Sequence, residues 1–143
     1  MKKPIYVYLI CHNRTDIKTL TYIGAAYDFR HRLDQHNGRI KGGPRITRKA
    51  AGCWEPVLVL EMGADRTYSS KLLKKDWKNN SRGLESRIRK GFELALKHKL
   101  RCFIMQNPNI KNGSILTKLE SKWKDGRILL STEEMSTLIA VPV

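Results

Sequence analysis

Three short runs of β-branched and aromatic residues limit the folds open to this chain more than any other feature of its sequence. They cover residues 5–10, 21–23 and 57–60, and residues of these types favour strands. A polar segment separates the first two runs, which predicts an antiparallel hairpin with a long loop. The third run is apolar on both faces, as is typical of a strand covered by helices. The sequence therefore predicts a small sheet of three strands.

A helix is expected between the second and third strands. Asp28 is suited to cap its N-terminus, and Gly38 is suited to end it. Phe29, Leu33 and His36 follow the helical spacing, so their side chains should share one side of this helix.

The rest of the chain carries shorter signals. Residues 40–52 are basic and glycine-rich, which predicts a loop leading into a short helix. Residues 69–78 and 83–99 have helical patterning, and the second segment carries an apolar stripe. A turn signal precedes an expected strand over residues 127–130, and Ser131 is suited to begin a last helix. Together these elements predict an α+β fold in which helices flank a three-stranded, mostly antiparallel sheet.

The charge of the chain is strongly positive. Its 143 residues include 28 Lys or Arg and 13 Asp or Glu, which gives a net charge of +15. A compact chain with this charge favours a polyanionic partner such as nucleic acid. Twelve of the basic side chains fall within residues 63–101, whereas residues 102–143 are nearly neutral. We expect one globular unit, with a main domain over residues 1–101 and a C-terminal extension over residues 102–143 packed on it.

The cysteines and the N-terminus indicate the compartment. Cys11, Cys53 and Cys102 are widely spaced and form no CxxC pair, which argues against a structural zinc site. Their odd number argues against a disulfide framework. The first apolar run is too short for a membrane span and lacks a cleavage site. The sequence therefore predicts an intracellular protein, in the cytoplasm, nucleoid or nucleus, with no membrane segment.

A set of short motifs follows one order along the chain. The segments VYLI at residues 7–10 and TYIG at residues 21–24 are followed by RLDQHNG at 32–38, KGG at 41–43 and WEPVLVL at 54–60. This ordered set resembles the GIY-YIG nuclease family, and the stretch from 32 to 60 is most similar to Slx1-like members, which cut branched DNA. The resemblance covers about residues 5–100 and implies a nuclease domain in this part of the chain.

The resemblance also implies roles for the polar side chains. Arg32 stands at the family's helical arginine, and its fork of donors suits a phosphate. Tyr8 takes the place of the general base, with Tyr22 beside it. A free tyrosine has a pKa of about 10, so Tyr8 would need a neighbouring cation to act as a base at neutral pH. His36 either relays a proton or holds the phosphate, or it is a half-buried helix residue.

A single carboxylate on a helix is the expected metal ligand, because Mg²⁺ needs only one or two such ligands. The resemblance favours Glu93 in this role, with Mg²⁺ or Mn²⁺ as the ion. Glu85 is the runner-up and Asp76 the third candidate. Each glutamate could instead pair with a cation one turn away, at Arg89 or Lys97.

Residues next to this constellation are expected to contact DNA. Glycines let backbone N–H groups approach phosphates, and basic side chains add salt-dependent affinity. The predicted nucleic-acid contacts are Asn37, Lys41, Gly42, Gly43, Arg45 and Arg48.

These observations predict a divalent-metal-dependent DNA endonuclease that hydrolyses phosphodiester bonds. Branched or flap DNA is the expected substrate, with DNA repair or recombination as the setting. One alternative is a sequence-specific restriction or homing enzyme, and another is a basic nucleic-acid-binding protein without catalysis. The expected assembly is a monomer or a homodimer.

Overall fold

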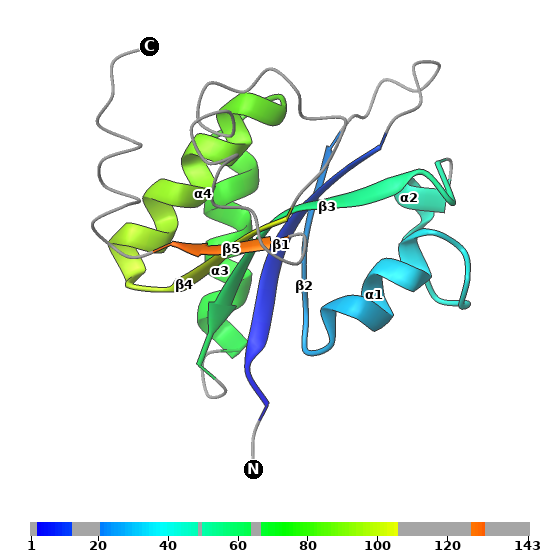
Figure 1. Cartoon of the computed structure of the whole chain (residues 1–143), viewed down its shortest axis with the longest axis horizontal. Helices are drawn as coiled ribbons and strands as arrows, with labels where there is room; N and C mark the ends of the chain where they lie inside the picture. The colour runs from blue at the N-terminus through cyan, green and yellow to red at the C-terminus, as the bar shows by residue number, and fades with distance from the viewer. Residues whose placement is uncertain (1–2, 13–20, 49, 64–66, 106–126, 131–143) are drawn as a thin grey trace.

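An antiparallel sheet forms the centre of the computed structural model, which describes residues 3–12, 21–48, 50–63, 67–105 and 127–130 (Figure 1). Its strands lie in the order β2-β1-β3-β4-β5, and every neighbouring pair is antiparallel. They are β1 (Ile5–His12), β2 (Thr21–Ala26), β3 (Trp54–Met62), β4 (Arg101–Met105) and β5 (Arg127–Leu130).

The predicted hairpin, third strand and late strand are confirmed, but the expected number of three strands in the sheet is wrong. The sheet has five strands. β4, which comes after α4 in the chain, pairs with β3, and β5 pairs with β4 at the edge of the sheet. β4 also spans the junction between residues 101 and 102, so the described parts of the C-terminal extension continue the same sheet. The helix expected from Ser131 lies outside the described residues.

The helices lie in two layers, one on each side of the sheet (Figure 1). One layer holds α1 (Phe29–His36) and α2 (Arg45–Arg48), and the other holds α3 (Thr67–Asn79) and α4 (Leu84–His98). All four were expected from the sequence, and the Asp28 carboxylate accepts a hydrogen bond from the backbone N–H of His31 at 3.1 Å, as a helix cap. None of the described helices is both long and apolar enough to cross a membrane.

Alternate residues of β1 serve the two layers, because successive side chains of a strand point to opposite faces. Val7 and Leu9 pack with α3 and α4 in the larger core cluster. Tyr8 and Ile10 belong to a smaller cluster on the α1 face.

Gly91 explains how closely α4 approaches the sheet. A Cβ at this position would lie 2.4 Å from Cδ2 of Leu58 and 2.7 Å from Cζ2 of Trp77. Trp77 is fully buried, and its indole N–H donates to the backbone carbonyl of Arg87 at 2.7 Å. This hydrogen bond therefore links α3 to α4.

Candidate active site

Three buried side chains form a hydrogen-bonded chain on the α1 face of the sheet. The hydroxyl of Tyr8 lies 2.7 Å from Nε2 of His36, at the end of α1. Nδ1 of the same ring lies 2.9 Å from the hydroxyl of Thr47 in α2. All three side chains are fully enclosed. The structure therefore brings two of the predicted site residues together and adds Thr47 to them.

The direction of these bonds follows from Thr47. Its hydroxyl donates to the backbone carbonyl of Pro44 at 3.0 Å, so its oxygen accepts from Nδ1–H of His36. Nε2 then carries the lone pair of a neutral imidazole and accepts the proton of Tyr8. Burial first, and then the charge of Arg32, lowers the pKa of His36 to about 4. The ring is therefore neutral at pH 7.

Tyr8 is a neutral phenol in this resting state. Burial raises its pKa well above the ordinary value of 10.0, and Tyr22 acts in the same direction. The charge and hydrogen bonding of Arg32 act in the opposite direction. Tyr8 can therefore take a proton from water only while it gives its own proton to His36.

Tyr22 lies on β2 beside these groups, and Gly24 makes room for them. The ring of Tyr22 is 4.9 Å from the ring of His36, centre to centre, and burial raises the pKa of Tyr22. A Cβ at Gly24 would lie 2.5 Å from the hydroxyl oxygen of Tyr8 and 2.9 Å from the ring of Tyr22. Only glycine allows the two tyrosines to pack together at this point.

Arg32 is fixed by two acceptors. Its Nη1 donates to Oε1 of Gln35 at 2.8 Å and to the backbone carbonyl of Gly42 at 3.2 Å. Gln35 in turn donates to the carbonyl of Lys41 at 3.1 Å. This arrangement holds a cation whose charge acts on both Tyr8 and His36.

Gly42 and Gly43 allow the basic loop to pack closely against Gln35 of α1. Gly42 has a φ of +111°, and a Cβ there would lie 2.6 Å from Nε2 of Gln35. A Cβ at Gly43 would lie 2.3 Å from the carbonyl oxygen of Gln35. The glycines therefore have a local role in holding Arg32, and their contact with nucleic acid stays a prediction.

Asn37 fastens the end of α1 to the start of β3. Its side-chain amide donates to the backbone carbonyl of Trp54 at 3.0 Å and accepts from the N–H of Trp54 at 2.8 Å. The indole of Trp54 donates to the carbonyl of Thr47 at 2.8 Å. Both functions of the Asn37 amide serve this junction, so its role is positional here, and a contact with DNA stays a prediction.

The remaining predicted DNA contacts lie on the surface beside Arg32. Lys41, Arg45 and Arg48 are all exposed. Nε of Arg48 donates to the carbonyl of Gly43 at 3.1 Å. We call these three exposed side chains, on the loop and the helix that follow α1, the basic rim.

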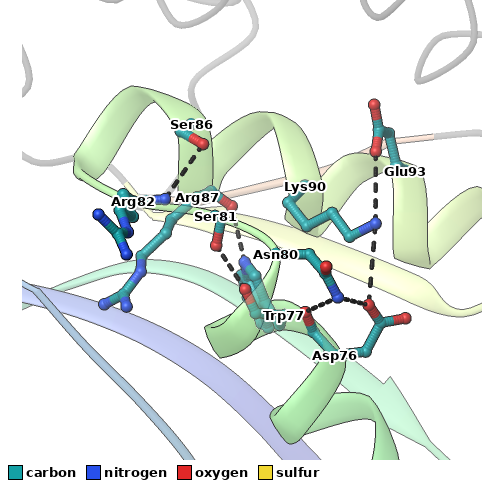
Figure 2. A network of polar contacts seen from close by, with 9 residues as sticks. All are labelled: Asp76, Trp77, Asn80, Ser81, Arg82, Ser86, Arg87, Lys90 and Glu93. Carbon is teal, nitrogen blue, oxygen red and sulfur yellow. Dashed lines mark hydrogen bonds and ion pairs between the residues drawn. The ribbon is translucent and has the colours of Figure 1, made fainter.

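Glu93 lies on the other helical layer. It belongs to α4, which packs on the Val7 face of the sheet. Its carboxylate lies 3.8 Å from Nζ of Lys90, which also lies 3.9 Å from the carboxylate of Asp76 (Figure 2). Asp76 accepts a further hydrogen bond from the amide of Asn80 at 2.6 Å.

Glu85 is on the same helix and pairs with Arg89 at 3.7 Å. Within the described parts of the chain, no hydrogen bond or ion pair joins Glu85 or Glu93 to Tyr8 or Arg32. The structure therefore does not bring the expected metal ligand together with the tyrosine, and the choice between the two glutamates stays a prediction.

The donor chemistry of these carboxylates fits a divalent cation with few protein ligands. The described residues contain no group of three or more His, Cys, Asp or Glu side chains able to hold a metal. Mg²⁺ keeps several waters and is bound through one or two carboxylates and phosphate oxygens. The ion pair of Glu93 with Lys90 is half-exposed and contributes little, so its oxygens are available to an ion.

Sequence reasoning missed Gln35 and Thr47. Gln35 stands three residues after Arg32 on one helix, a spacing at which side chains meet, so a signal for it was present. Thr47 lies in a different helix from His36, and no local pattern links the two positions.

The chain was compared with known proteins. Residues 4–85 match the GIY-YIG catalytic domain. Proteins named structure-specific endonuclease subunit slx1 are similar to it. The protein from Talaromyces marneffei is 37% identical over 68 residues, which cover 46% of this chain and 18% of the relative. The protein from Aspergillus niger is 44% identical over 62 residues, covering 41% and 15%. The chain thus spans less than a fifth of the length of these relatives.

Proposed function

Because the chain belongs to the GIY-YIG family, we propose that it is an endonuclease that hydrolyses phosphodiester bonds of DNA at the site around Tyr8. The observation that carries this proposal is the 2.7 Å contact between the Tyr8 hydroxyl and Nε2 of His36. It supplies a path for the proton of an attacking water.

The proton path has two linked transfers. A water attacks phosphorus and gives its proton to the oxygen of Tyr8, while the hydroxyl proton of Tyr8 moves to Nε2 of His36. The bond from phosphorus to the oxygen of the leaving strand breaks, and that oxygen takes a proton from solvent. The step requires that DNA binding uncovers the Tyr8 hydroxyl, which is enclosed in the free protein. The imidazolium that results keeps its Nδ1–H bond to Thr47. Because each group is neutral at the start, no buried charge is present until the substrate arrives.

Arg32 is proposed to bind the phosphate that is cut. Charge develops on the phosphate oxygens in the transition state, and a fixed cation stabilises it without reorganising. The bonds to Gln35 and Gly42 hold the guanidinium in advance. The same charge favours the ionised form of Tyr8, so one side chain assists both the base and the phosphate.

GIY-YIG nucleases generally depend on a divalent metal, and we propose Mg²⁺ for this chain, with Mn²⁺ as a substitute. When bound, the ion would supply positive charge that offsets charge on DNA phosphates. Because the candidate carboxylates lie on α4, on the layer opposite Tyr8, the described residues do not place this ion at the phosphate beside Tyr8. Glu93 is the proposed ligand, with Glu85 as the alternative. Either carboxylate is half-exposed or more and held only by a loose ion pair.

The proposed substrate is branched or flap DNA. Support comes from the names of the relatives, which describe structure-specific endonucleases, and from the exposed basic rim of Lys41, Arg45 and Arg48. Contacts of basic side chains to phosphate position a duplex without reading its sequence. Recognition would then depend on the shape of the DNA backbone and on how readily it bends.

Cleavage of three substrates of equal length tests this proposal. A flap, a four-way junction and a random linear duplex are each incubated with the protein and Mg²⁺ at physiological salt. We expect the two branched forms to be cut and the duplex to be cut poorly. Discrete fragments from the duplex that map to one short sequence, with no preference for branches, would instead support a restriction or homing enzyme.

A further inference from the structure

An aromatic pocket lies on the α1 face of the sheet, next to Tyr8. Its volume is about 360 Å³, within the size range of ligand sites. Its apolar lining comes from Tyr6, Tyr27, Phe29, Val59 and Phe103. The mechanism proposed above uses none of these five side chains.

The strand register ties this pocket to the candidate active site. Tyr8 pairs with Val59 of β3, and Val59 pairs with Phe103 of β4. Directly paired residues on one face lie about 5 Å apart. Val59, at the floor of the pocket, is therefore the direct cross-strand neighbour of Tyr8. Phe29 forms a shared wall, because its ring centre is 5.0 Å from that of Tyr8. A group bound in the pocket would therefore be a neighbour of the phosphate at Tyr8.

Cations stand beside these rings. The guanidinium of Arg101 lies 5.5 Å from the centre of the Phe103 ring, and Lys3 lines the pocket itself. The single carboxylate of the lining, that of Asp28, accepts the capping hydrogen bond from the N–H of His31. Arg101 also lies 3.9 Å from the carboxylate of Glu61, which balances part of its charge. The surroundings are flat and apolar, with Lys3 at the edge, which suits the face of a nucleobase with its phosphate nearby.

Tyr27 gives the pocket an open side. It lies in the turn between β2 and α1, and its side chain is 49% exposed, whereas Val59 at the floor is 5% exposed. A flat ring entering from solvent can therefore stack on an accessible aromatic face and reach an apolar floor.

We propose that this pocket binds the base of an unpaired nucleotide adjacent to the phosphate that is cut, an inference that rests on the proposed nuclease function. A base in an intact duplex is stacked on both sides and is not available to the pocket. A base in a single-stranded flap, or at the opened end of a junction, enters at a lower energetic cost. The pocket thus gives a physical reason for a preference for branched DNA that does not depend on base sequence.

Fluorescence of 2-aminopurine tests this directly. The analogue is placed in the single strand of a flap, next to the junction, and the full chain is added without divalent metal, so that the DNA stays intact. Stacking on an aromatic ring should quench the fluorescence. The variants are Tyr27→Ala and Phe103→Leu, which remove a ring, and Tyr27→Phe, which retains it. Leu72→Ala is the matched control, because Leu72 is a 52% exposed apolar residue of α3 on the opposite layer.

We expect the wild type, Tyr27→Phe and Leu72→Ala to quench alike, while Tyr27→Ala and Phe103→Leu quench less. The two ring-removing variants should also bind the flap about tenfold more weakly, with an unchanged slope of affinity against salt, because no phosphate contact is lost. Affinity for a plain duplex should not change. Equal quenching in all variants would overturn the pocket, as would an equal loss of affinity for flap and duplex.

A cleavage assay on the same preparations separates this inference from the function on which it rests. If the wild type cuts flaps with Mg²⁺ but Tyr27→Ala leaves quenching and affinity unchanged, the proposed base-binding role of the pocket is wrong and the nuclease proposal stands. If the wild type cuts no DNA while quenching still depends on Tyr27, the pocket is a binding site of a protein without the proposed activity.

Discussion

The hydroxyl of Tyr8 donates to Nε2 of His36 over 2.7 Å, and both side chains are fully buried. The tyrosine comes from the first strand of the chain and the histidine from the end of the first helix. Thr47 fixes which nitrogen of the ring carries the proton. This relationship joins a family motif to the proposed route for a proton, and it leads to predictions for these residues.

Thr47→Val should lower both stability and cleavage. Valine keeps the shape of threonine but leaves the Nδ1–H of His36 buried without an acceptor, which costs about 1–3 kcal/mol. The altered ring position and tautomer should also slow turnover. Chemical denaturation and initial cleavage rates measure the two effects. Thr47→Ser retains the hydroxyl and should restore turnover. Equal turnover in Thr47→Val and wild type would show that Thr47 does not orient His36 for catalysis.

The stability of the protein should fall as the pH drops from about 7 towards 4. The pKa of His36 is about 4 in the folded protein and about 6.5 when unfolded, so the unfolded chain binds more protons between these values. Stability therefore increases with pH across this window and shows no contribution from His36 above it. Denaturation midpoints at several pH values measure the slope. His36→Gln, which does not titrate, should have a shallower slope, and an identical slope in both proteins would contradict the buried neutral ring.

Glu93→Gln should abolish cleavage while DNA binding is largely retained, because the substitution removes the proposed ligand of the ion together with a negative charge. Higher concentrations of Mg²⁺ or Mn²⁺ should restore part of the activity if binding of the ion is weakened. Cleavage is measured across a metal titration, with Glu85→Gln and Asp76→Asn as matched variants. If Glu85→Gln is inactive and Glu93→Gln is active, Glu85 and not Glu93 is the metal ligand.

The basic rim should set the salt dependence of DNA binding. Lys41→Ala and Arg45→Ala should each weaken binding and reduce the slope of log affinity against log salt by about one. Asn37→Ala should instead reduce stability, because its amide holds Trp54 through two hydrogen bonds. Titrations at four salt concentrations measure the slopes. Slopes that stay at the wild-type value in both basic variants would exclude the rim from phosphate contact.

Local signals in the sequence were sufficient for most of the fold. The hairpin, the cap at Asp28 and the two later helices follow from residue type and spacing, and the structure confirms them. The strand count failed because β4 is a five-residue run directly after a helix. Its place in the sheet depends on pairing with β3, which no local pattern encodes.

The candidate site was predictable only in part, for a similar reason. The family motifs pointed to Tyr8 and His36, but their contact joins positions 28 residues apart. No local pattern indicates that Thr47 orients the ring or that the Asn37 amide holds the start of β3. Such relationships depend on how α1 and the basic loop dock on the sheet, and that docking is a property of the whole fold.

Nicking of supercoiled plasmid by wild type and Tyr8→Phe tests the central claim most directly. The substitution removes one oxygen and with it the proposed acceptor of the water proton. Wild type should nick the plasmid with Mg²⁺ and not with EDTA, and Tyr8→Phe should be slower by about a hundredfold or more, with unchanged DNA affinity. Leu72→Ala, an exposed position of α3 on the opposite layer, is the control and should cut at nearly the wild-type rate. Full activity in Tyr8→Phe, or tight binding by wild type without nicking at any metal concentration, would contradict a nuclease site at Tyr8.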